Sequence, residues 1–168
     1  MEITITKGAV ADSLHIQRSD GTLVSTTFPH KGPIPHDAVH FFVESELGMQ
    51  DGFWGLVATG SHPEEVGPMA KAAGHPSAAR PGLPQAGIVS AIQAERIVEC
   101  FEADLWGPGC DPQTFRETVS AGCEQSLVPA IPIDDEAIER VRRRLKEFRQ
   151  HWMGLPLGHS CRLEWADG

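Results

Sequence analysis

The Asp20-Gly21 pair is the sequence feature that most restricts the fold of this 168-residue chain. It stands between two β-prone runs, residues 14–18 and 22–28, and glycine supplies the positive φ that a tight hairpin turn requires. The preceding run, residues 2–6, alternates polar and apolar side chains with a period of two, as a half-buried strand does. Three short antiparallel strands are therefore predicted at the N-terminus.

Helical patterns dominate the rest of the chain. Proline, glycine and capping signals predict five helices, over about 35–47, 53–58, 86–105, 113–125 and 134–153. In the last, apolar residues recur every three or four positions, which predicts one buried stripe: Ile138, Val141, Leu145, Phe148 and Trp152. Residues 161–165 alternate again and are expected to return as a fourth strand beside the N-terminal sheet. Strands followed by helices indicate an α+β fold: a small antiparallel sheet packed by about five helices.

Length and composition favour a single domain over residues 1–168, with an ordinary 40% apolar and 22% charged content. Residues 61–85 are rich in proline, glycine, alanine and serine and hold few large apolar side chains. Such a segment gains little from burial, so it is predicted to be a mobile loop, either disordered or functional.

Charge and cysteine content exclude several classes of protein. The net charge of −9 disfavours binding to nucleic acids and to anionic membranes, and no apolar run is long enough to predict a membrane span. The cysteines form no Cys-x-x-Cys pair and are expected to be free thiols: Cys100, Cys110, Cys123 and Cys161. Because no signal segment is recognised either, a cytoplasmic location is expected.

The strongest chemical signal is a pair of histidines, His36 and His40, at the start of the first predicted helix. Residues four apart on a helix lie one above the other, and two helical histidines so arranged can hold one divalent metal ion. A helical wheel places His36 within the apolar face and His40 at its rim. Because an unpartnered buried polar group costs on the order of 1–3 kcal/mol, both imidazoles require a metal, a carboxylate, a backbone carbonyl or water.

A metal site needs a third ligand. Glu44 stacks over His40 and is a candidate ligand together with His36 and His40, although the wheel directs Glu44 toward solvent and places it about 12 Å from His36 along the helix axis. Geometry favours a carboxylate from the helix over 86–105, which carries Glu95, Glu99 and Glu102; His30 is a further candidate. Two histidines, one carboxylate and an open position suit zinc or iron and activate a water molecule.

Two resemblances involve this region. The segment His36-Asp37-x-x-His40 resembles the His-Asp-x-x-His zinc motif of a ubiquinone-biosynthesis family of helical proteins that act on the quinone head group, but Gly52 stands where that family has a glutamate. The wider pattern HDxxHFxxE followed by GFWGxxA is similar to a bacterial family of small proteins without an assigned activity, in which the same blocks follow an N-terminal hairpin. The first resemblance implies zinc, and neither supplies a reaction.

Two functions are therefore considered. One is a metal-binding protein, specifically a metal-dependent hydrolase or related enzyme that uses zinc on a small-molecule substrate, with Phe53 and Trp54 either in the core or walling its pocket. The other is a non-catalytic module that binds a protein partner, in which the histidines are structural. The basic residues of the last helix complement its dipole or form an anion- or partner-binding surface: Arg140, Arg142, Arg143, Arg144, Lys146 and Arg149.

Overall fold

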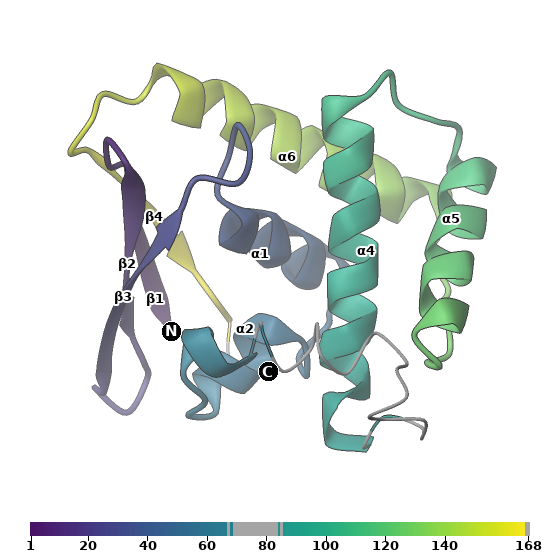
Figure 1. Ribbon diagram of the computed structural model, residues 1–168, viewed down its shortest axis with the longest axis horizontal. Helices are drawn as coiled ribbons and strands as arrows, with labels where there is room; N and C mark the ends of the chain where they lie inside the picture. Colours follow the sequence, from purple (N-terminus) through teal and green to yellow (C-terminus); the bar gives the residue numbers. More distant parts are fainter. Residues whose placement is uncertain (67, 69–83, 85, 167–168) are drawn as a thin grey trace.

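Four strands form one antiparallel sheet in the computed structural model, which describes residues 1–66, 68, 84 and 86–166 (Figure 1). The order is β3-β2-β1-β4, with bounds β1 Glu2–Thr6, β2 Ala11–Gln17, β3 Leu23–Pro29 and β4 Ser160–Glu164. The C-terminal strand therefore lies beside β1, as predicted, with Ile3 opposite Leu163.

The predicted hairpin turn joins β2 to β3. Gly21 adopts a φ of 86°, its amide donates to the Arg18 carbonyl, and the Thr22 amide donates to the Asp20 carboxylate at 2.8 Å. This turn fixes a register in which Ile16 lies opposite Val24.

Helices cover one face of the sheet, and together the elements confirm the α+β fold. Their bounds agree with the predicted ranges to within three residues: α1 His36–Leu47, α2 Phe53–Ala58, the 3₁₀ turn η1 Ala86–Ile88, α4 Val89–Trp106, α5 Pro112–Gln125 and α6 Asp135–Gly154. Asp111 and Asp134 cap α5 and α6 by accepting from backbone N–H groups.

Helix α1 occupies the centre of the molecule, between the sheet and the long helix α4 (Figure 1). Its apolar residues pack with the inward side chains of the sheet, and α6 crosses above it with its predicted stripe buried. One side of α1 therefore faces α4, and polar side chains on that side are enclosed between two helices.

Three further expectations concern particular segments. Residues 63–66 are helical and Val66 is buried, whereas residues 67, 69–83 and 85, which hold most of the expected loop, lie outside the described residues. All four cysteines are free thiols, as expected, and burial raises the pKa of Cys100 to about 11. Across the described ranges, every helix is too short or too polar to cross a membrane.

Candidate metal centre

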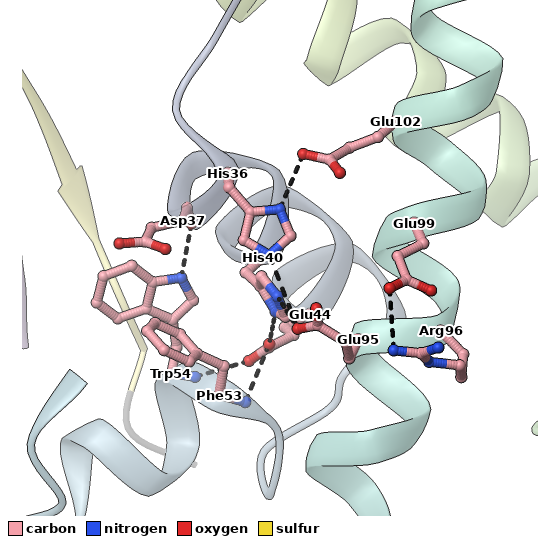
Figure 2. A network of polar contacts seen from close by, with 10 residues as sticks. All are labelled: His36, Asp37, His40, Glu44, Phe53, Trp54, Glu95, Arg96, Glu99 and Glu102. Atoms are coloured by element: carbon pink, nitrogen blue, oxygen red, sulfur yellow. Dashed lines mark hydrogen bonds and ion pairs between the residues drawn. The ribbon is translucent and has the colours of Figure 1, made fainter. Parts of the chain in front are cut away.

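Helix α1 presents His36 and His40 side by side toward α4 (Figure 2). Pro35, with its φ of −59°, precedes the first helical residue, so His36 lies in the first turn and His40 one turn later. Their ring centroids are 4.8 Å apart in an edge-to-face arrangement. The two rings therefore share one side of the helix, as the four-residue spacing predicts.

Glu95 on α4 reaches the Nε2 atoms of both rings. Its Oε2 lies 3.2 Å from Nε2 of His40 and 3.7 Å from Nε2 of His36. One ligand atom from each residue lies within 4.8 Å of the other two. The side chains of His40 and Glu95 are only 3% and 2% exposed, and that of His36 is 17% exposed. We call these three residues the His36-His40-Glu95 cluster.

The Nδ1 atom of each histidine is held by another carboxylate. Nδ1 of His36 donates to Glu102 at 2.9 Å, and Nδ1 of His40 donates to Glu44 at 2.8 Å. A carboxylate on one ring nitrogen fixes the orientation and the tautomer of a histidine whose other nitrogen binds a metal. Both rings are therefore held with Nε2 directed toward Glu95.

The predicted exposure of Glu44 is wrong, because its side chain is completely buried. Besides His40, its carboxylate accepts the backbone N–H groups of Phe53 at 3.0 Å and Trp54 at 2.9 Å. The helical wheel treats α1 alone, whereas α2 folds back beneath it and covers this side. The chain passes so close that a Cβ on Gly52 would lie 2.7 Å from the Glu44 carboxylate.

The remaining candidate metal ligands contact other residues. Both oxygens of Glu44 are engaged by N–H donors on the Nδ1 side of His40, and a direct ligand role for Glu44 stays a prediction. Glu99 accepts from Arg96 at 2.9 Å. His30 contacts Asp12 of β2 at 2.9 Å instead of turning back to the histidine pair.

Charge inside the cluster favours a bound cation. Burial disfavours the protonated form of His40, but its hydrogen bonds to Glu44 and Glu95 outweigh that effect and raise its pKa to about 10. The pKa of His36 is likewise raised, because Glu102 and Glu95 outweigh burial. Burial alone would raise the pKa of Glu95, yet its two histidine partners hold that pKa well below the usual range. The buried carboxylates thus favour a positive charge at the cluster, which protons or a metal ion can supply.

A buried nitrogen of His36 lacks a hydrogen bond in the part of the chain that the structure describes. Nε2 of His36 is buried and finds no hydrogen-bond partner among the described residues; its nearest charged neighbour is Glu95, at 3.7 Å. Ligand atoms about 2.0–2.1 Å from a tetrahedral zinc ion lie roughly 3.3–3.4 Å from each other. The two distances to Glu95, 3.2 and 3.7 Å, are within a few tenths of an ångström of that spacing. All three ligand atoms lie within 4.8 Å of one another, so the set is wider than a closed zinc site and would have to contract around an ion.

The cluster opens into a pocket of about 490 Å³, which we call the metal pocket. Phe53 forms one wall, with its ring centroid 5.1 Å from that of His40. Trp54 is fully buried and donates its indole N–H to the carbonyl of Asp37. Asp37 also lines the pocket, and burial raises the pKa of its carboxyl group. The other lining residues are Thr26, Thr27, Phe28, Pro29, Lys31, Pro63, Glu64 and Pro68.

Comparison with protein-family models, curated proteins and solved structures finds no match for this chain. The function is therefore inferred from the geometry of the His36-His40-Glu95 cluster and the pocket above it.

Proposed function

We propose that this protein binds one zinc ion through Nε2 of His36, Nε2 of His40 and a carboxylate oxygen of Glu95, and that it is a metal-dependent hydrolase. The observation that carries the proposal is the convergence of three ligand atoms within 4.8 Å, from two helices. In this proposal Glu44 and Glu102 do not bind the metal; they orient the two imidazoles.

The set of ligand atoms favours zinc over other divalent ions. Two imidazole nitrogens and one carboxylate oxygen are the protein ligands of many catalytic zinc sites, in which the fourth position holds water. Magnesium and calcium prefer sites made of oxygen atoms alone. Iron(II) accepts the same three protein ligands and is therefore included in the test.

The open side of the cluster supports a catalytic function. A zinc-bound water has its pKa lowered to about 7 and attacks carbonyl or phosphoryl groups near neutral pH. The metal pocket, of about 490 Å³, is within the usual size range for small-molecule sites. Its apolar wall at Phe53 and its polar residues Thr26, Thr27 and Lys31 suit a small molecule with both apolar and polar parts.

A second function, the non-catalytic module, is favoured by one observation. Both nitrogens of His40 already contact carboxylates, Glu44 at 2.8 Å and Glu95 at 3.2 Å. A protonated His40 therefore neutralises buried charge without any metal. In that case the histidines stabilise the packing of α1 against α4, and the protein acts through a partner.

Metal analysis distinguishes the two functions. The protein is purified without a histidine tag, its metal content is measured by mass spectrometry, and zinc and iron(II) are titrated against a chromophoric chelator. We expect one zinc per chain, and at least 100-fold weaker binding in His36→Ala, His40→Ala and Glu95→Gln. His151→Ala, which removes an exposed imidazole at the end of α6, is the matched control and leaves the affinity unchanged.

The hydrolase assignment has its own assay. Chromogenic carboxylic esters, phosphate esters and anilides are offered to the zinc-loaded protein and to Glu95→Gln. Turnover that requires both zinc and Glu95 supports the hydrolase. Stoichiometric zinc without turnover of any probe limits the function to metal binding. Absence of stoichiometric metal, with variants that change only stability, supports the non-catalytic module.

A further inference from the structure

A second pocket, of about 650 Å³, lies between the C-terminal end of α4, residues 107–111 and helix α6. It shares no lining residue with the metal pocket. Its lining includes Arg142, Lys146 and Arg149 of the basic face of α6. These residues take no part in the metal site. We call it the α4–α6 pocket.

An ion pair makes one wall of this pocket rigid. Arg142 donates to both oxygens of Asp104, from Nε at 2.7 Å and from Nη2 at 3.1 Å, and Nη2 also donates to the carbonyl of Cys110 at 2.7 Å. Asp104 in turn accepts the backbone N–H of Cys110 at 2.9 Å. The segment between α4 and α5 is therefore fixed on both sides, and the pocket is formed before any ligand arrives.

The remaining charges of the lining leave positive charge unbalanced. Arg142 is neutralised by Asp104 and by Glu139, at 2.7 Å from Nη1. The Asp111 carboxylate also lines the pocket and accepts from the first turn of α5, so the lining holds one more cation than carboxylates. Within the described residues, no carboxylate lies at ion-pair distance from Lys146 or Arg149. Arg149 donates to the carbonyl of Leu105, at 3.1 Å. These two cations face one pocket in a chain whose net charge is −9.

The base of the same pocket is apolar. The half-buried Leu105 and the exposed Pro108 supply its accessible apolar surface, above Phe101 and Leu145, which are each only 1% exposed. An apolar surface beside two exposed cations is complementary to a molecule with an apolar body and an anionic head group. A bare inorganic anion would leave the apolar part uncovered.

We propose that the α4–α6 pocket binds a small organic anion. Its apolar body lies against Leu105 and Pro108, and its carboxylate or phosphate group lies between Lys146 and Arg149. The site is independent of the metal centre, since the two pockets have no residue in common.

The test uses the full chain without metal and three probes of equal chain length: hexanoate, hexyl phosphate and hexanol. Binding is followed by amide chemical shifts in two-dimensional NMR. We expect at least one of the two anions to bind ten or more times tighter than hexanol, with shifts at residues 107–111 and around Lys146. The tighter of the two anions identifies the head group.

Variants locate the site. The double variant Lys146→Ala/Arg149→Ala is expected to bind the preferred anion at least tenfold more weakly. Arg143→Ala removes an exposed charge from the same helix outside the pocket and is expected to bind as the wild type does. Equal binding of hexanol and the anions, or a double variant that binds like Arg143→Ala, overturns the proposal. Because the replaced side chains are exposed, the variants are expected to fold, which circular dichroism checks.

Discussion

Nε2 of His40 lies 3.2 Å from Oε2 of Glu95, and this contact joins helices α1 and α4 across 55 positions of the sequence. The other nitrogen of the same ring contacts Glu44, only four residues away. The imidazole is thus enclosed by two buried carboxylates. Two such charges require a compensating positive charge, and either a proton or a metal ion supplies it.

Glu44→Gln tests the support behind His40. An amide has one oxygen, so its NH₂ group must face at least one of the N–H donors of His40, Phe53 and Trp54 that the carboxylate now accepts. We expect a loss of about 2–4 kcal/mol in the free energy of unfolding, measured with urea, and weaker zinc binding. Glu46→Gln, on the same helix in partly exposed ion pairs with arginines, is the control and should cost less than about 1 kcal/mol.

Gly52→Ala tests the close approach of α2 to α1. The φ of −77° at this position suits alanine, so any cost comes from the added methyl group, which would lie 2.7 Å from the Glu44 carboxylate. We expect a less stable protein with at least tenfold weaker zinc binding. Gly87→Ala, where the added methyl group meets nothing within 4 Å, is the control. Equal stability and zinc affinity in the two variants would show that the Glu44 carboxylate can move without consequence.

Zinc affinity is expected to rise with pH. The pKa of His40 is raised to about 10 and that of His36 is also raised, so at neutral pH zinc must displace protons from the ligands. One displaced proton gives about a tenfold gain in affinity per pH unit, and two give about 100-fold. Chelator competition at pH 6, 7 and 8 measures the slope, and calorimetry in buffers of different ionisation enthalpy counts the protons. A pH-independent affinity would contradict protonation of the cluster.

Stability of the metal-free protein is expected to fall as pH rises above neutrality. A histidine whose folded pKa is about 10 against an ordinary 6.5 stabilises the fold fully below pH 6.5, and this contribution is lost as the pH rises toward 10. Glu95, whose pKa is lowered, contributes above its ordinary pKa and loses this contribution in acid. Urea unfolding between pH 5.5 and 9.5 should therefore give a declining wild-type curve, with a flatter curve for His40→Gln.

Features that depend on neighbouring residues alone are predictable from the sequence. The Asp20-Gly21 turn, the Asp111 and Asp134 caps and the stripe from Ile138 to Trp152 depend on neighbouring residues alone, and the structure contains each of them. The spacing of His36 and His40 likewise places both rings on one side of α1.

The remainder of the site depends on how helices pack. The sequence placed Glu95, Glu99 and Glu102 on one predicted helix, but only the rotation of α4 against α1 selects Glu95 for both Nε2 atoms. The burial of Glu44 depends on α2, which folds back against α1. A helical wheel of α1 includes only the residues of α1 and therefore cannot predict this contact. Gly52, directly before a Phe-Trp pair, was the one available signal of a close chain approach.

The most direct measurement is a crystal structure of the zinc-loaded protein with anomalous data collected on both sides of the zinc absorption edge. We predict one anomalous peak per chain, about 2.0–2.2 Å from Nε2 of His36, Nε2 of His40 and an oxygen of Glu95. Glu44 and Glu102 should remain on the Nδ1 atoms. An empty His36-His40-Glu95 cluster in crystals grown with excess zinc, or zinc bound only elsewhere on the chain, would contradict the proposed metal centre.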